Sequence, residues 1–263
     1  MPLPPAPMPL FRGGRPLKRW RYAGVYDAAV QLCAGIVRVG PLAQTFWAVW
    51  DPESKRLHER TRLLRRRAVR LDSARLRVRD ADVLVDLAVD AGAPVEVVSP
   101  HGSQYIWTRK QGGVRARGVV RLGERERRID ARAVIDESAG YHARATAWQW
   151  SAGVGESVDD RPVAWNLVDG VHDGERASER TVWVEGVPHE LPPVRFAPDL
   201  DAIGWAGGEA LRFEQQAERR RDDNLLIVRS SYRQPFGRFT GTFPGAIELA
   251  EGWGVMERHE ARW

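Results

Sequence analysis

The side chains best suited to acid–base chemistry lie close together in the middle of the chain. Asp136, Tyr141 and His142 bring together a carboxyl, a phenol and an imidazole, and Trp148 and Trp150 follow them. Burial of a carboxyl among indole rings raises its pKa toward the range in which a general acid works. We therefore interpret Asp136, Tyr141 and His142 as candidate catalytic residues, and the two tryptophans as candidate walls of a ligand site.

The position of Asp136 also allows a purely structural interpretation. If the strand expected over residues 127–135 runs on unbroken, Asp136 shares a face with Arg128, Asp130 and Arg132. That face is charged, because alternate residues of a strand point the same way. A bulge at Asp136 would then be needed to turn its carboxyl inward. Without a bulge, Asp136 only ends a strand.

A second candidate for ligand binding is the aromatic segment that contains Tyr105 and Trp107. Alternation places both rings on one face with Arg109, and Lys110 on the other face. Such a face could line the mouth of a ligand site with one charged anchor, or stack nucleic-acid bases. It could equally cover one end of a β core, where aromatic side chains are common.

Asn166 begins a third cluster, with Asp169, His172 and Asp173 close behind it. Carboxylates and an imidazole at this density resemble a metal site. Both aspartates are followed directly by glycine, however, which is ordinary turn chemistry. We expect no metal and no cofactor, and we keep Asn166 as a candidate ligand-binding residue.

The sequence contains no recognisable nucleophile. It has no G-x-S-x-G motif, and no histidine adjoins the pair Ser230-Ser231 in the chain. The single cysteine, Cys33, lies in an apolar run, where a thiol is typically buried and inert. One cysteine also excludes an intrachain disulfide and a zinc site made of several thiolates. These absences argue against hydrolases and transferases.

The charge of the chain is basic and unevenly distributed. Its 263 residues include 40 Lys+Arg against 35 Asp+Glu, and the densest basic segment runs from Arg60 to Arg70. Such a segment can bind phosphate backbones or anionic lipid headgroups. It is also typical of a solvated strand face, so nucleic acid is not the partner that we expect, and binding through this segment is a third hypothesis.

The secondary structure that must position these residues is β throughout. Apolar and polar residues alternate with period 2 from Arg21 onward, with turn residues at roughly 8–12-residue intervals, which predicts an antiparallel sandwich or barrel. The best helix candidate is the short segment 63–69. A hairpin is expected over 74–90, with Arg75 opposite Asp86 and Arg79 opposite Asp82. Two further turns are expected at Gly112-Gly113 and Gly207-Gly208.

The alternation also suggests how the chain is divided. We expect a disordered Pro-rich arm over residues 1–18, an N-terminal β domain over 19–134 and a C-terminal β domain over 135–263. The start of the chain lacks the charged and apolar regions of a signal peptide, and no apolar run reaches the roughly 18–20 residues of a membrane-spanning helix. We expect a cytoplasmic protein with no membrane span.

Five segments near the two ends of the chain have a recognisable pattern. They are Arg19-Trp20-Arg21-Tyr22-Ala23-Gly24-Val25-Tyr26-Asp27, Leu32-Cys33-Ala34-Gly35, Gln44-Thr45-Phe46-Trp47-Ala48-Val49-Trp50-Asp51, Arg233-Gln234-Pro235-Phe236-Gly237 and Gly254-Val255-Met256-Glu257-Arg258-His259. Together they resemble a bacterial family catalogued as domain of unknown function 2804, and the likeness runs from Trp20 to Trp263. The family has no established activity.

In the middle of the chain, Asp136-Glu137-Ser138-Ala139-Gly140 is followed by Ala147-Trp148-Gln149-Trp150. These two segments are similar to the Asp-His-Glu-Trp-Gly and Gly-Trp-Asp-Trp segments of the tandem lipocalin-like proteins, which include carotenoid 1,2-hydratases and relatives of tocopherol cyclase. Asp136, Gly140, Trp148 and Trp150 carry over, but the His and Glu of the first motif, the proton donors that the family would use for alkene hydration, do not. The resemblance implies two barrel or half-barrel β domains that enclose an apolar ligand.

Together these observations predict an all-β protein of two tandem lipocalin-like domains that binds a hydrophobic small molecule in a barrel cavity. The ligand-binding candidates are Tyr105, Trp107, Trp148, Trp150 and Asn166. The alternative is an acid–base enzyme of the hydratase, cyclase or isomerase type that acts on an isoprenoid or other apolar substrate.

Overall fold

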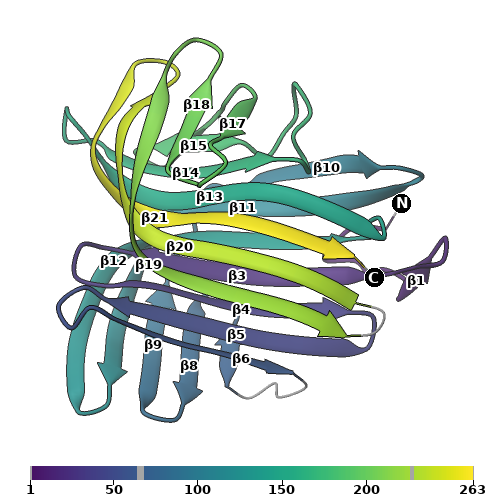
Figure 1. Ribbon diagram of the computed structural model, residues 1–263, viewed down its shortest axis with the longest axis horizontal. Helices are drawn as coiled ribbons and strands as arrows, with labels where there is room; N and C mark the ends of the chain where they lie inside the picture. The colour runs from purple at the N-terminus through teal and green to yellow at the C-terminus, as the bar shows by residue number, and fades with distance from the viewer. Residues whose placement is uncertain (1, 64–67, 226–227, 263) are drawn as a thin grey trace.

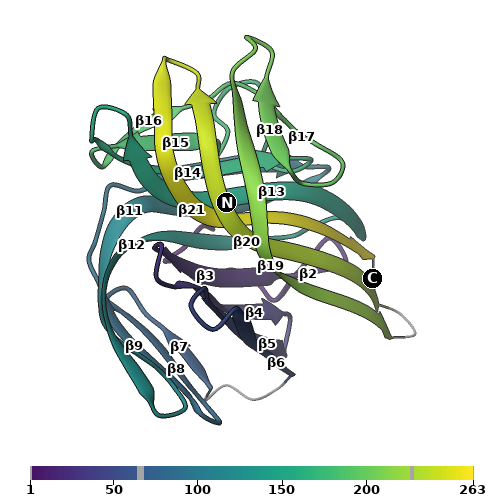
Figure 2. The same cartoon turned by 60° about the vertical axis from the view of Figure 1, so that its left-hand side comes forward.

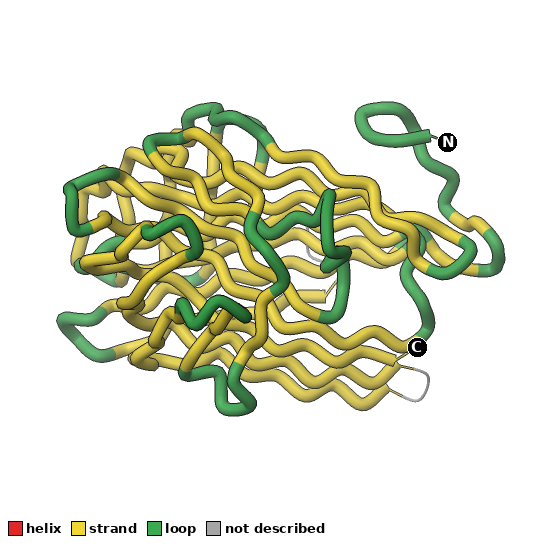
Figure 3. The backbone as a smooth tube through the Cα atoms, turned by 90° about the horizontal axis from the view of Figure 1, so that it is seen from above, coloured by secondary structure: helices red, strands yellow, loops and turns green. Residues whose placement is uncertain are grey.

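The structure, a computed structural model, describes residues 2–63, 68–225 and 228–262, and every regular element within them is a β-strand. Figure 3 shows the same result as a tube of strands and loops. All pairings are antiparallel, so the predicted fold class is confirmed. No helix in these three ranges has the length and apolarity to cross a membrane. The helix candidate 63–69 falls mostly outside the described residues.

The first large sheet contains ten strands and curls on itself. They are β3 (Lys18–Tyr26), β4 (Gln31–Val39), β5 (Leu42–Asp51), β6 (Arg56–Leu63), β7 (Val69–Leu71), β8 (Arg75–Asp80), β9 (Val83–Val89), β10 (Val95–His101), β11 (Gln104–Leu122) and β12 (Arg125–Gly140). The order is β6-β5-β4-β3-β12-β11-β9-β8-β7, with β10 paired to β11. Strands β7–β9 fold round toward β3–β6, which makes a half-barrel (Figure 2).

The second large sheet contains nine strands in the order β16-β15-β14-β13-β21-β20-β19-β18-β17. They are β13 (Ala145–Ser157), β14 (Pro162–Asp169), β15 (Thr181–Val184), β16 (Val187–Glu190), β17 (Val194–Phe196), β18 (Ala202–Trp205), β19 (Ala210–Leu225), β20 (Val228–Phe243) and β21 (Ile247–Arg262). A small hairpin of β1 (Phe11–Arg12) and β2 (Arg15–Pro16) precedes both sheets.

The two large sheets repeat one topology, although the amino-acid letters show no repeat. Each sheet begins with a four-stranded meander, and its last strand returns to pair with its first, β12 with β3 and β21 with β13. Figure 1 shows the second sheet lying across the first. The tandem arrangement of two barrel-like sheets is therefore confirmed.

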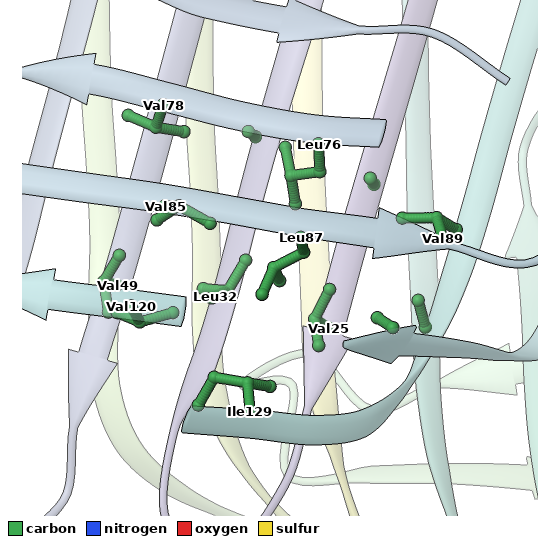
Figure 4. Packing of buried hydrophobic residues seen from close by; sticks show 14 of the residues in the cluster. Val25, Leu32, Val49, Leu76, Val78, Val85, Leu87, Val89, Val120 and Ile129 are labelled. Atoms are coloured by element: carbon green, nitrogen blue, oxygen red, sulfur yellow. The ribbon is translucent and has the colours of Figure 1, made fainter. Parts of the chain in front are cut away.

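Apolar side chains fill the inside of each curl. In the first sheet, Val25 and Leu32 pack against Leu76, Val85 and Leu87 from the opposite strands of the curl (Figure 4). The second sheet has its own core, which is richer in aromatic rings and includes Trp165, Phe239 and Phe243. Burial of such side chains contributes roughly 25 cal/mol per Å² of apolar surface.

A third buried cluster lies between the two sheets, and we call this region the seam. Tyr22 and Trp50 contribute to it from the first sheet, and Trp150, Phe236 and Val255 from the second. Strands β3–β5, β11 and β12 are therefore covered on both faces, by their own core on one side and by the other sheet on the opposite side. This double covering places polar residues of the outer face in a buried environment.

Two expectations about turns differ from the structure. The hairpin of β8 and β9 is present, but its turn is Ala81-Asp82, so Arg77 rather than Arg75 lies opposite Asp86. Ala81 takes a positive φ of 51° to make this turn. Arg75 still pairs with Asp86 diagonally, at 2.6 Å, because long side chains reach the neighbouring position.

The pair Gly112-Gly113 is a β-bulge inside β11 and not a hairpin turn. A Cβ on Gly112 would lie 2.3 Å from the Trp183 ring of the second sheet, so the missing side chain lets that indole pack against β11. The pair Gly207-Gly208 does form the turn between β18 and β19, as expected.

The predicted division of the chain remains a prediction. Its boundary at 134/135 falls within β12, and the connection between the two sheets is the segment after Gly140 and before Ala145. The N-terminal segment lies against the first sheet, where Met8 and Leu17 are buried in a cluster with Tyr105 and Tyr141.

Candidate functional site

The polar centre of the seam contains two buried carboxyl groups, one from each sheet, and each is held by an indole. Trp20 Nε1 of β3 donates to Asp136 Oδ1 of β12 at 3.3 Å. Trp148 Nε1 of β13 donates to Glu257 Oε1 of β21 at 2.9 Å. The two indole rings stack with centroids 6.4 Å apart and planes 13° apart. The seam therefore places an aromatic pair directly beside two potential acid–base groups.

Glu257 is the most strongly organised group of the site. Besides Trp148, it accepts hydrogen bonds at Oε2 from the Tyr232 hydroxyl at 2.8 Å and from Gln234 Nε2 at 3.2 Å. Burial raises its pKa from 4.5 to about 7, and the negative charge of Asp136 adds to this shift against the effect of the hydrogen bonds. A carboxyl with this pKa can both donate and accept a proton near neutral pH.

Asp136 lies in a buried ion-pair group with one cation and two carboxylates. Lys110 Nζ is 2.5 Å from Asp136 Oδ1 and 3.3 Å from Glu179 Oε2. Burial raises the pKa of Asp136, and the Lys110 ammonium opposes that shift. Burial alone would lower the pKa of Lys110, but the two carboxylates outweigh it and the net shift is upward. Lys110 therefore stays charged between its two partners.

The bulge that the sequence required for a buried Asp136 is absent from β12, which pairs with β3 in continuous register across this residue. Asp136 remains on the strand face predicted from the alternation, and Arg132 on the same face forms an ion pair with Glu156 at the surface. The carboxyl is buried because the second sheet covers this end of the face, whereas the Arg132 end stays at the edge.

His142 joins this group from the connection between the sheets. Its ring lies 5.2 Å from that of Trp20 and 5.7 Å from that of His101. Burial lowers the pKa of His142 well below 6.5, and nearby Lys18 adds to the shift. His172, from the segment between β14 and β15, is also buried, which lowers its pKa to about 3. Both imidazoles are therefore neutral at neutral pH.

Trp150 and Asn166 lie deeper in the seam. Trp150 Nε1 donates to Asn166 Oδ1 at 2.8 Å, and Asn166 Nδ2 donates to the backbone carbonyl of Glu179 at 2.9 Å. The Trp150 ring meets Tyr22 of the first sheet edge-on, at 5.4 Å. Asn166 thus fixes the segment that carries Glu179, and Trp150 forms an aromatic wall.

Tyr105 and Trp107 lie on the face of β11 opposite to that of Lys110, and Tyr141, just after the end of β12, packs with them. The Tyr105 and Tyr141 hydroxyls donate to the backbone carbonyls of Pro2 and Pro9, at 2.7 and 2.8 Å. Trp107 Nε1 donates to Glu96 at 3.2 Å. The structure therefore separates the predicted residues into a seam group, Asp136, His142, Trp148, Trp150 and Asn166, and an outer group beneath the N-terminal segment.

The sequence analysis placed Lys110 on the correct face of its strand without a role, and it did not propose Trp20, Glu179, Tyr232 or Glu257 as site residues. No feature of the neighbouring sequence identifies the residues that were missed, because they lie in ordinary alternating strands or in a loop. Glu257 lies in one of the segments that carry the family resemblance, which was the only available signal.

The structure also brings a histidine next to Ser230, which has none beside it in the chain. Ser230 Oγ and His259 Nε2 are 2.9 Å apart across β20 and β21. Burial lowers the pKa of His259 to about 3, so this imidazole is a weak base. Ser230 lines an open pocket of about 690 Å³ at the end of the second sheet, together with Thr146 and Asp223.

The third cluster and the basic segment have structural partners. Asp173 accepts a turn hydrogen bond from the Gly170 amide at 2.8 Å. Within the described ranges, no three His, Cys, Asp or Glu side chains are arranged to hold a metal ion.

Arg60 and Arg62 of the basic segment both pair with buried Asp80, and these bonds lower the Asp80 pKa to about 2. The arginines at 65–67 lie outside the described residues.

Comparison with known proteins gives one family and several structures. A family model described as "Domain of unknown function (DUF2804)" matches residues 64–263. No curated protein sequence matches the chain significantly. The matched range includes the last two segments of the predicted family resemblance, 233–237 and 254–259, and begins after the first three.

Solved structures share the fold at low sequence identity. A candidate AttH protein from Nitrosomonas europaea is 13% identical, with a TM-score of 0.61 and 98% of both chains covered. Kievitone hydratase from Nectria haematococca is 9% identical, with a TM-score of 0.57 and coverage of 92% of this chain and 88% of its own. CghA with Sch210972 is 8% identical, with a TM-score of 0.50 and coverage of 94% and 88%. The predicted likeness to tandem lipocalin-like proteins is confirmed for the fold.

Proposed function

This chain belongs to the DUF2804 family, and on that premise we propose that it is an acid–base enzyme acting on a small, largely apolar molecule at the seam. Glu257 is the proton donor, and Asp136 is the carboxylate that accepts a proton on the other side of the indole pair. The reaction class is hydration, cyclisation or isomerisation of a carbon–carbon double bond.

The observation that carries this proposal is the environment of Glu257. Its carboxyl is buried, is held by three side-chain hydrogen bonds and has a pKa of about 7. Perturbed pairs of carboxyls in an aromatic site are a common signature of acid–base assignments. Asp136, 2.5 Å from the Lys110 ammonium, is the second carboxyl of the pair and the group to which we assign proton acceptance.

The proposed step moves protons and breaks no bond to a leaving group. Protonated Glu257 gives its proton to one carbon of the double bond, and a carbocation forms at the other. The faces of Trp20 and Trp148 stabilise that positive charge. Asp136 then takes a proton either from a neighbouring carbon, which isomerises the substrate, or from an attacking water molecule, which hydrates it.

The comparisons support this proposal at the level of the fold. One structural neighbour is named a hydratase, and the identity of 9% means that its chemistry reaches this chain only as a suggestion. Binding of an apolar molecule without chemistry is the second candidate, and the aromatic walls of the seam favour it. A ligand cavity inside a curled sheet has less support, because packed aliphatic and aromatic side chains occupy both interiors.

The test is proton exchange. Wild-type protein is incubated in D₂O with a panel of apolar alkenes and enones, isoprenoids among them, and products are examined by mass spectrometry for added deuterium or water. We expect incorporation with wild type, its loss in Glu257→Gln and its retention in Trp107→Phe, which alters an indole of the outer group. Binding of panel members without incorporation would favour the second candidate.

A further inference from the structure

Four buried polar side chains beside the Lys110 group have hydrogen-bonding atoms with no partner among the described residues. Thr108 and Ser138 are 0% and 3% exposed, and His142 and His172 are 3% and 7% exposed. The unpartnered atoms are Thr108 Oγ1, Ser138 Oγ, His142 Nε2 and both ring nitrogens of His172. Buried polar groups are normally hydrogen-bonded, and a buried donor or acceptor left without a partner is destabilising.

Strand pairing places the two hydroxyls side by side in the seam. Thr108 lies directly opposite Ser138 on the β11–β12 ladder, and Lys110 lies opposite Asp136 on the same face. Ser138 is also the register partner of Trp20 on β3. Directly opposed residues have Cβ atoms about 4.5–5.5 Å apart, so one small group can reach both hydroxyls.

The two histidines adjoin the same place. The His142 ring lies 5.2 Å from Trp20, the neighbour of Ser138. His172 is close enough to Lys110 and Asp136 for both charges to act on its pKa. The unpartnered atoms therefore belong to one group, contributed by β11, β12, the connection between the two sheets and the segment between β14 and β15.

The charges around this group are unsuited to an anion. Lys110 is shared by two carboxylates, Asp136 and Glu179. Arg15, whose charge acts on His142, donates to the backbone carbonyls of His101 and Tyr141. Lys18 also lies near His142, but burial lowers its pKa from 10.5 to about 6, so this amine is mostly uncharged at neutral pH. A bound carboxylate or phosphate would face two like charges and a cation that they already neutralise.

We propose that this group is the polar subsite of the seam, and that it selects substrates with an uncharged oxygen function, a hydroxyl or a ketone, over substrates with a carboxylate or phosphate. The apolar body of the substrate lies against Trp20 and Trp148, and its oxygen exchanges hydrogen bonds with Thr108, Ser138 and His142. This inference rests on the proposed function, because it names the substrate class of the same site.

The experiment compares three probes of one shape, 2-naphthol, naphthalene-2-carboxylate and naphthalene, by isothermal titration near neutral pH. We expect 2-naphthol to bind at least about tenfold more tightly than either of the others, the gain of one or two hydrogen bonds. Equal or tighter binding of the carboxylate would overturn the inference, and so would failure of 2-naphthol to bind.

The matched variant is Thr108→Val, which keeps the shape of the side chain and removes the hydroxyl. Because this hydroxyl has no protein partner, the substitution should leave the unfolding midpoint unchanged or raise it, while the preference for 2-naphthol over naphthalene falls severalfold. Thr61→Val, at a hydroxyl bonded to Arg219 away from the subsite, should leave that preference unchanged. A lowered midpoint with unchanged preference would assign Thr108 a structural role and contradict the inference.

These results can be separated from those of the proposed function. If 2-naphthol is preferred but Glu257→Gln does not reduce deuterium incorporation, the acid–base assignment fails and the subsite stands. If incorporation depends on Glu257 but the carboxylate binds as well as the alcohol, the subsite fails and the assignment stands.

Discussion

Trp20 and Trp148 stack across the seam with their ring centroids 6.4 Å apart, and each donates its indole N–H to a buried carboxyl of its own sheet. The two tryptophans come from strands β3 and β13, the first strands of the two sheets. Docking of the sheets thus builds the aromatic pair and brings Asp136 and Glu257 together in one step. Changes at this contact should therefore alter acid–base properties as well as stability.

The first prediction concerns the hydrogen bond from Trp148 to Glu257. This bond favours the ionised carboxylate, so Trp148→Phe should raise the Glu257 pKa above its value of about 7. A bond to a charged group is worth about 1.5 kcal/mol or more, which corresponds to about one pKa unit. A carbon-13 carboxyl NMR titration, with Glu257→Gln to assign the signal, measures the shift. Trp107→Phe is the control, and an unchanged or lower pKa in Trp148→Phe would contradict the prediction.

The second prediction concerns stability against pH. Because burial raises the Glu257 pKa from 4.5 to about 7, the folded protein holds a proton that the unfolded chain releases between these values. The stabilisation from this bound proton is complete below pH 4.5 and is lost as the pH rises through about 7. The free energy of unfolding falls by about 3 kcal/mol over this range. Urea denaturation at several pH values should show this decline in wild type relative to Glu257→Gln. Parallel curves for the two proteins would disprove it.

The third prediction concerns the buried ammonium. Lys110→Met leaves Asp136 and Glu179 together without a cation, and breaking a buried pair in this way costs about 3–5 kcal/mol. Chemical denaturation should show the loss directly. Arg115→Met, which breaks the exposed pair with Asp130, should cause no resolvable change. Similar midpoints for the two variants would show that the Lys110 group does not stabilise the fold.

The fourth prediction concerns the glycine at the bulge of β11. In Gly112→Ala the new Cβ would lie 2.3 Å from the buried Trp183 ring, so the sheets must separate locally, at a cost of about 1–3 kcal/mol. Gly204→Ala is the matched control, because the nearest atom to its added Cβ is 4.0 Å away. Thermal unfolding monitored by tryptophan fluorescence compares the two. An equal fall in the unfolding temperature of both variants would show that the close approach of Trp183 to Gly112 does not affect stability.

The sequence alone predicted the β-strand content and which side chains share a face of a strand. Alternation along 74–90 predicts a hairpin with one apolar face, and the structure has it as β8 and β9 with a shifted register. Alternation also placed Tyr105 and Trp107 on one face and Lys110 on the other, as observed. These properties are local, because the side-chain period of a strand decides them.

The composition of the site was decided by the tertiary structure. Asp136 was visible in the sequence, but its burial depends on the second sheet. Its partner Lys110 comes from β11, and Glu179, which shares that ammonium, comes from the loop before β15. Glu257 lies far along the chain and meets Trp148 only because β21 returns to pair with β13. Alternation tells which side chains share a face of a strand. It does not tell which faces meet, because that depends on contacts between segments distant in sequence, and here those contacts turn an outward polar face into the interior of the seam.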